Sequence, residues 1–415
     1  MNLFLEILLV LLLTRIFSEG AERLGQPAGV GELLAGMALA LAAGFLGTSL
    51  PFLKEITTSE ALGQIAQVGI FFLMLLAGIE SNLNELRQNY KGSVGVAIGG
   101  AAAPLTLGIL LGWAILPESE FKCVQAMLIG ISMAITSVPA NIKVLTDFGL
   151  LHSRIGQTMV AAAIFDDVLG LFMLAVLTSM IQTGGPPDLT ALAWLVVKIL
   201  AFFAITVSLG VHVYPHISRG LKGLQSAALE FSALMAVGLG YGALAEALGM
   251  HWILGAFMAG LFFEPSRVGY KAYHEINLIA VAITRGFLGP FFFASIGLHL
   301  NFDVVVAFPW LILIVILLAF VGKLLGAGLP ARLAGLNTRE AMAVGVGMSS
   351  RGAVELIVLS IAAEAGLFLQ GDGDHGLVTH LFSALVLMGV VTTLISPMIL
   401  KRILPPALPK RVRNG

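Results

Sequence analysis

Two adjacent aspartates, Asp166 and Asp167, lie inside the apolar stretch from Thr158 to Met180. This stretch is long enough to cross a bilayer, so both carboxylates fall near the middle of a membrane. An ionised carboxylate in hydrocarbon is costly, and two neighbouring carboxylates also repel each other. Such a pair is tolerated where water, protons or cations reach it. The two residues therefore indicate ion transport.

A lysine in a second apolar stretch supplies a counter-charge. Lys323 lies within LLAFVGKLLGAGLPARL, and at that depth its ammonium needs a carboxylate or must lose its proton. Successive helical residues point about 100° apart, so Asp166 and Asp167 cannot share Lys323 equally. We expect one aspartate to pair with the lysine and the other to stay available for an ion. A structural salt bridge is the alternative for the lysine and its partner.

Further charges occur in the segment MSSRGAVEL. Arg351 and Glu355 are four residues apart, a spacing that allows an ion pair along a helix. Glu32, in an earlier apolar stretch, is a second carboxylate that could neutralise Arg351. We expect these three charges to be structural, with a gating role as the alternative.

Two apolar stretches are interrupted near their middles by small polar residues with Pro or Gly. ISMAITSVPANIK contains Thr136, Ser137 and Asn141, and VGVGMSSRGAVELIV contains Arg351. Such interruptions are typical of helices that break around a binding site in a transporter. The three polar side chains could supply neutral oxygens to a cation, or the hydroxyls could bond only to their own helix.

The composition is that of a polytopic membrane protein. The chain has 415 residues, of which 58% are hydrophobic and 11% charged, and its mean hydropathy is +0.97. Cys123 is the lone cysteine, which excludes an intramolecular disulfide, and the histidines lack zinc-site spacing. We expect no cofactor and no nucleic-acid partner.

About thirteen apolar stretches predict an all-α fold of transmembrane helices. They lie at about 1–16, 27–48, 61–80, 92–115, 122–141, 155–181, 189–213, 224–246, 250–263, 284–301, 307–331, 340–363 and 378–400. The polar stretch 264–284 could hold an interfacial helix.

The distribution of the 23 Lys and Arg residues predicts an outside N-terminus and an inside C-terminus, with Lys54 and Lys122 on the outside. We expect a membrane domain over 1–403, built from two inverted six-helix repeats at about 1–181 and 224–403, with crossed broken helices and a linker helix at about 189–213. We expect residues 404–415 to form a short basic cytoplasmic tail, and we expect no regulatory domain.

Several ordered segments carry a family resemblance. They are LGQPAGVGELLAGMALAL, IFFLMLLAGIESNL, ITSVPA, FDDVLG, GAFMAGLFF, PFFFASIGLHLNF and MSSRGAVEL. With them the chain resembles the monovalent cation:proton antiporter family over nearly its whole length. The Asp-Asp pair with a later lysine is similar to the NapA-like electrogenic sodium/proton exchangers. The resemblance implies that Asp167 binds a cation (Na⁺) or proton, while Asp166 pairs with Lys323. Many relatives have Glu directly after Arg-Gly, so no role carries over to Glu355.

We therefore expect a multi-pass protein of the cytoplasmic (inner) membrane that serves pH homeostasis, not an enzyme. It would exchange Na⁺, and also Li⁺, for protons by electrogenic alternating access, with K⁺/H⁺ exchange as the alternative. A remote alternative is an intramembrane aspartyl protease, since 371–374 read GDGD and 406–408 read PAL. A channel or an organic-anion carrier is a third.

The charged and broken helices should form a moving core, and the other helices a static scaffold. Gly95 and Gly99, at GxxxG spacing, favour placing their helix in the scaffold, at a homodimer interface, with close packing inside a helix bundle as the alternative.

Overall fold

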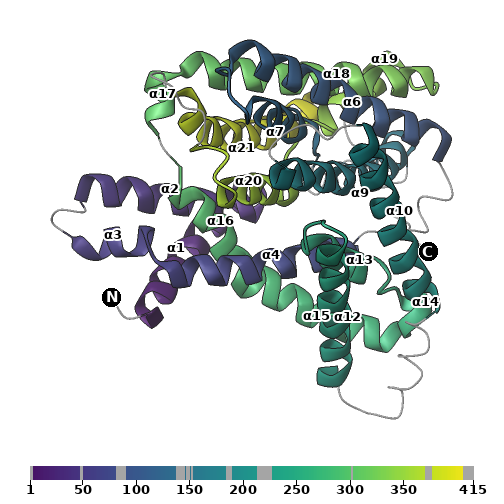
Figure 1. Cartoon of the computed structure of the whole chain (residues 1–415), viewed down its shortest axis with the longest axis horizontal. Coiled ribbons are helices and arrows are strands. Elements are labelled where there is room, and N and C mark those ends of the chain that lie inside the picture. Colours follow the sequence, from purple (N-terminus) through teal and green to yellow (C-terminus); the bar gives the residue numbers. More distant parts are fainter. Residues whose placement is uncertain are drawn as a thin grey trace, which may run out of the picture. The chain divides into compact units, whose positions relative to one another are not determined.

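The structure is a computed structural model whose described residues form helices and no strands. It describes residues 3–46, 50–80, 90–136, 145, 150, 153–183, 189–212, 227–300, 302–369 and 376–404. Figure 1 shows the helices and their labels. The all-α fold expected from the apolar composition is confirmed in these residues.

The chain divides into two compact units, and each combines a segment from the N-terminal half with one from the C-terminal half. Unit 1 comprises 1–83 and 174–300, and unit 2 comprises 84–173 and 301–415. The division into inverted repeats at 1–181 and 224–403 stays a prediction.

Unit 1 is built around α4, which packs on α13 and α16, while α2 packs on α1 and α16 (Figure 1). Its apolar contacts include Val10 of α1, Leu39 of α2 and Phe291 of α16. Its helices are α1 (Leu3–Arg23), α2 (Ala28–Leu46), α3 (Pro51–Thr57), α4 (Glu60–Glu80), α10 (Leu189–His212), α12 (Ala227–Ala247), α13 (Ile253–Leu261), α14 (Pro265–Val268), α15 (Tyr270–Ile283), the π-helix η1 (Thr284–Leu288) and α16 (Gly289–Leu298).

Unit 2 holds most of the charges that the sequence singles out. Within unit 2, α6 packs most extensively against α18 and α7 (Figure 1). Its helices are α6 (Tyr90–Ile115), α7 (Lys122–Ala134), α17 (Asp303–Ala307), α18 (Pro309–Leu333), α19 (Thr338–Gly347), α20 (Ala353–Glu364) and α21 (Leu377–Ile403). The helix α9 (Arg154–Thr183) belongs to unit 2 up to Met173, a part that includes both aspartates.

The helix α18 shows how one sequence serves both a lipid-facing side and a core. Every fourth residue on one side is a large apolar residue that is exposed: Leu313, Leu317, Val321, Leu325, Leu329 and Leu333. The side that is fully buried carries Val315, Ala319, Lys323, Ala327 and Ala331. Because residues four apart share a helix face, the apolar stripe faces outward while Lys323 is held inside unit 2.

The two expected helix interruptions differ in how much of them is described. The predicted helix at 340–363 is broken into α19 and α20, and Gly352 between them is extended. The predicted helix at 122–141 ends at Ala134, and Ile135 is extended. A chain that leaves the helix here exposes backbone groups, which side chains or ions must satisfy.

One predicted helix boundary is wrong. The helix placed at 284–301 begins at Tyr270, because α15 continues through the π-turn η1 into α16. Arg285 therefore lies within a continuous helix rather than at the start of a new one. Its guanidinium pairs with Glu80 at the end of α4, and that pairing offsets a charge inside an otherwise apolar run.

The expected role of the Gly95–Gly99 spacing is also corrected. Their helix α6 belongs to unit 2, with the charges, and the close approach at Gly99 is to Gly326 of α18. A Cβ at Gly99 would also lie 2.9 Å from Cγ of Pro330. The small residues therefore let two helices of one unit approach closely.

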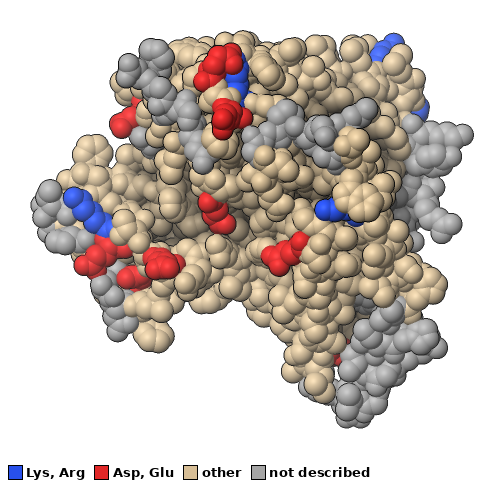
Figure 2. Space-filling model, viewed as in Figure 1, with Lys and Arg blue, Asp and Glu red and all other residues tan. Residues whose placement is uncertain are grey.

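Nine helices among the described residues are long and apolar enough to cross a membrane. The remaining predicted stretches correspond to α1, the short helices α7 and α13, and the broken pair α19–α20. Most of the face seen in Figure 2 consists of residues other than Lys, Arg, Asp and Glu, in keeping with the apolar composition. The total of thirteen spans and their orientation stay predictions.

Candidate functional site

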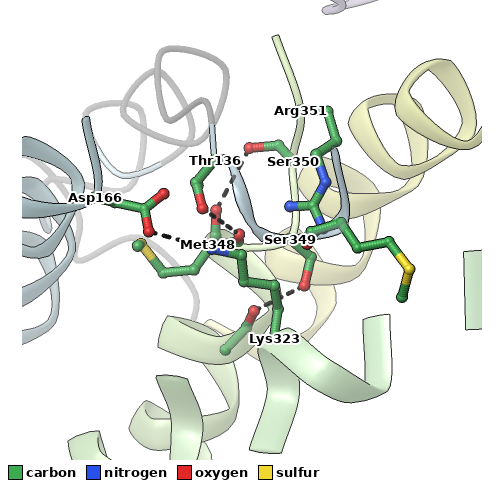
Figure 3. Close-up of polar contacts among 10 residues, drawn as sticks. Thr136, Asp166, Lys323, Met348, Ser349, Ser350 and Arg351 are labelled. Carbon is green, nitrogen blue, oxygen red and sulfur yellow. Dashed lines mark hydrogen bonds and ion pairs between the residues drawn. The ribbon is translucent and has the colours of Figure 1, made fainter. Parts of the chain in front are cut away.

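A buried ion pair joins α9 to α18 inside unit 2. Lys323 Nζ lies 3.4 Å from Asp166 Oδ1, and the two residues are 0% and 2% exposed. Figure 3 shows the Asp166 carboxylate directed toward Lys323. The structure thus brings together the lysine and the first aspartate, the pairing that the family resemblance implies.

Close helix packing holds the lysine in place. Gly322, the residue before Lys323, faces Pro104 of α6, where a Cβ would lie 2.8 Å from the proline Cα. Gly326, one turn later, faces Gly99 in the same way. The small residues on either side of Lys323 thus let α6 approach α18 closely, and the lysine itself is fully buried in the packed unit.

Among the described residues, one oxygen of Asp166 has no hydrogen-bond partner, and Asp167 takes no part in the ion pair. Asp166 Oδ2 is buried and has no hydrogen-bond partner among the described residues. Asp167, the next residue of α9, is partly exposed rather than buried. The second aspartate is therefore the more accessible of the two, and the first has an oxygen free to join it around a cation.

Thr136 connects the two interrupted regions. Its hydroxyl donates to the carbonyl oxygen of Met348 at 3.1 Å, at the end of α19 (Figure 3). Ser349 and Ser350 donate back to carbonyls of their own helix. Ser137 and Asn141, the other oxygen donors expected here, lie outside the described residues.

Arg351 occupies the break between α19 and α20 and is 2% exposed. Its guanidinium Nη2 donates to the carbonyl oxygen of Met133 in α7. Its backbone N–H donates to Thr393 Oγ1 of α21 at 2.9 Å, and the threonine hydroxyl donates back to the Arg351 carbonyl at 2.8 Å. A side chain of α21 thus hydrogen-bonds the backbone N–H and carbonyl of Arg351 at the break, while the arginine side chain reaches the end of α7.

The expected ion pair between Arg351 and Glu355 does not form. Glu355 is 0% exposed, and neither of its carboxylate oxygens has a hydrogen-bond partner among the described residues. Four-residue spacing brings side chains together only along a continuous helix. Here Gly352 is extended and α20 begins at Ala353, so Arg351 lies outside the helix that carries Glu355.

Glu32 belongs to unit 1, where it has another partner. Its Oε1 lies 3.8 Å from Arg15 Nη1. The same arginine donates to the carbonyl of Gly286 in the π-turn η1, at 2.6 Å. The arginine thus links the buried carboxylate to the π-turn.

The backbone groups of this site, and the side chain that α21 contributes to it, were not predicted from the sequence. The carbonyls of Met133 and Met348 have no sequence signal, because every residue carries one. Thr393 did have a sequence signal: it is the second of two adjacent threonines, Thr392 and Thr393, in the middle of the apolar stretch 377–403. A polar residue at such a depth needs a partner.

The fold and the site define a class of protein. Apolar helices, one of them broken and another ending near a buried carboxylate–lysine pair, are typical of a secondary transporter for a cation. The model of the family "Sodium/hydrogen exchanger, transmembrane" matches residues 8–405. The chain belongs to this family.

The relatives cover nearly the whole chain. It is 33% identical to the Na(+)/H(+)-K(+) antiporter GerN of Bacillus cereus, over 96% of this chain and 95% of that protein. It is 31% identical to the Na(+)/H(+) antiporter of Enterococcus hirae, over 95% and 96%. The fold resembles that of the sodium proton antiporter from Methanocaldococcus jannaschii, with a TM-score of 0.73, 17% identity and 97% of each chain covered.

The chain is accordingly a multi-pass membrane protein and a cation/proton antiporter, as expected, and the cytoplasmic membrane fits its bacterial relatives. Family membership rules out the aspartyl protease alternative, because the relatives are transporters rather than enzymes. The GDGD and PAL segments lie outside the described residues.

Proposed function

We propose that this antiporter exchanges Na⁺ for protons at Asp167, with Li⁺ as a second substrate. The buried pair of Asp166 and Lys323 is the observation that carries the proposal. A cation and a proton compete for one site only if a carboxyl there is charged in one state and neutral in the other. Asp167 is the partly exposed carboxyl next to the pair, and it fits this requirement.

In this proposal the cation disturbs the ion pair. When Na⁺ binds Asp167, the free oxygen of Asp166 turns toward the cation and the carboxylate leaves Lys323. The ammonium is then buried without a partner and loses its proton as the neutral amine forms. One Na⁺ enters as Asp167 and Lys323 each release a proton, so the exchange moves net charge and is electrogenic, as in the NapA-like branch.

Access from the two sides would alternate around this site. The interruptions after α7 and between α19 and α20 supply irregular backbone beside the charges, which lets short helix ends shift without unfolding a whole span. We expect Asp167 to bind its cation from one side of the membrane and to release it to the other. We also expect the protein to work as a homodimer.

Potassium is the alternative substrate. A relative that aligns with 96% of this chain is named a Na(+)/H(+)-K(+) antiporter, and this name supports K⁺ as the alternative cation. Selectivity between the two depends on cavity size and on the placement of oxygens.

The test is cation-driven proton flux in proteoliposomes, with Na⁺, Li⁺ and K⁺ compared at clamped and free membrane potential. We expect Na⁺ and Li⁺ to drive flux, at rates that respond to the potential. Lys323→Gln should abolish flux or make it insensitive to the potential. Wild-type rates that ignore an imposed potential would contradict the electrogenic mechanism, and flux driven by K⁺ alone would contradict the choice of Na⁺.

A further inference from the structure

A second buried carboxyl in unit 2 takes no part in the mechanism above. Glu355 lies in the first turn of α20 and is fully buried, and neither of its oxygens has a hydrogen-bond partner among the described residues. A buried carboxylate ion without a partner is expensive, whereas a neutral carboxyl costs far less. The observed surroundings therefore suit the protonated form of Glu355.

The neighbouring helix makes room for this carboxyl. Gly389 of α21 has no side chain, and a Cβ at that position would lie 2.7 Å from Glu355 Oε2. Any other residue there would force the carboxyl to move, because the contact would be tighter than real Cβ contacts. The carboxyl thus fits into a space that α21 leaves for it.

An arginine with unused donors binds the same face of α21. Thr393, four residues after Gly389, bonds to the backbone of Arg351. Residues four apart are neighbours on a helix, about 6 Å along its axis. Of the guanidinium nitrogens, Nη2 donates to Met133, while Nε and Nη1 have no partner among the described residues.

We propose that Glu355 binds a proton independently of the aspartate pair, and that loss of this proton draws Arg351 away from Met133. In the protonated state, which the structure represents, the guanidinium holds the end of α7. In the deprotonated state the carboxylate attracts the free guanidinium N–H groups, since a charge-assisted hydrogen bond is stronger than one to a carbonyl.

The other charged groups near α20 leave this interaction to Arg351. On α7, Lys122 pairs with Glu118 at 2.6 Å, eleven residues before Met133. The titratable groups of α21 are far along the helix, at least nine residues, or about 13 Å, from Gly389. They are His380, Lys401 and Arg402. Arg351 is the charged group that acts on Glu355, and it also acts on Asp166.

The proton would control how firmly the two interrupted regions are joined. The described contacts between them include Arg351 to Met133 and Thr136 to Met348. Removing the first leaves the end of α7 less restrained. Protonation of Glu355 thus stabilises the joined state, and by linkage the joined state binds this proton more tightly.

Hydrogen exchange at the end of α7 tests the proposal in the full-length protein. After correction for the intrinsic pH dependence of exchange, protection of the segment around Met133 should fall as pH rises. Glu355→Gln, which mimics the protonated acid, should keep the segment protected at every pH. Glu364→Gln, the same change at an exposed position of α20, should behave as wild type. The second readout is cation/proton exchange in proteoliposomes. The dependence of its rate on pH should become less steep by about one proton in Glu355→Gln, but not in Glu364→Gln.

Two results would overturn the proposal. One is pH-dependent protection in Glu355→Gln equal to that of wild type. The other, which needs no folded variant at Glu355, is wild-type protection that does not change with pH. The test is separate from the sodium mechanism, because Asp167→Asn should lose transport and keep the pH-dependent protection. If that variant loses the pH dependence, the proton belongs to the aspartate pair.

Discussion

Asp166 and Lys323 depend on each other because neither reaches water. The two residues are almost completely buried and 3.4 Å apart, so each charge is offset mainly by the other. Removing one partner of a buried pair leaves an uncompensated charge, at a cost of about 3–5 kcal/mol, whereas replacing both is often close to neutral. The buried pair therefore leads to a prediction about stability that does not depend on which ion is transported.

Asp166→Asn should lower thermal stability strongly, because Lys323 is then left without its carboxylate. Asp166→Asn with Lys323→Met should recover most of the loss, since the double variant leaves no buried charge behind. Thermal unfolding of the purified variants in detergent checks both outcomes. A double variant less stable than either single variant would contradict the interpretation of the pair.

Single residues also show what the sequence could reveal of the site. A charge in an apolar run is visible in the letters, so Asp166, Asp167 and Lys323 could be identified from the sequence alone. The partners of Arg351 could not, because Met133 contributes a backbone carbonyl. The space for Glu355 at Gly389 was equally hidden, since a glycine in a helix usually signals nothing of the kind.

Side chains of α21 hold the break between α19 and α20, and Ser396 of α21 donates to the Val346 carbonyl at the end of α19. Thr393 accepts from the N–H of Arg351 and donates to its carbonyl. Helix ends inside a membrane need such partners, because no water is present to replace them. The small polar residues MSSRG predicted this break, and the structure confirms it. The π-turn at Thr284–Leu288 had no signal in the sequence, and the polar stretch 264–284 led to the prediction of a helix that begins only at residue 284.

Thr393→Val should loosen the break by removing both hydrogen bonds, at a cost of about 1–3 kcal/mol for the buried groups left unpaired. Thr392→Val is the matched control, because the bond recorded for the Thr392 hydroxyl among the described residues stays within its own helix, to the Gly389 carbonyl. We expect reduced exchange and lower thermal stability in the first variant and a much smaller effect in the second. Equal effects in the two variants would contradict a specific role for Thr393.

In the molecule as a whole, the aspartate site should be open to one side of the membrane at a time. Val160 and Leu174 lie seven residues before and after Asp167, about two turns away on its own side of α9. Single cysteines at these positions, in a Cys123→Ser background, should react with impermeant thiol reagents from opposite sides. Labelling of one should rise as labelling of the other falls when Na⁺ or pH is changed. Simultaneous labelling of both in one condition would indicate a continuous pore.

The all-helical class of the fold was predictable, because apolar stretches long enough to cross a membrane indicate transmembrane helices. The two units were harder to foresee, since each is assembled from distant segments. Placing α6 with the scaffold failed for this reason: Gly95 and Gly99 indicate close packing without saying against which helix. The partner, α18, is more than two hundred residues away in sequence.

The most direct test of the central claim is Na⁺-driven proton flux by purified Asp167→Asn in proteoliposomes. Asparagine keeps the size of the side chain but cannot pass between a charged and a neutral form. We predict that the variant folds and inserts with the thermal stability of wild type, because Asp166 still pairs with Lys323, and that its exchange is abolished. Exchange at the wild-type rate would contradict the assignment of Asp167 as the site that cation and proton share.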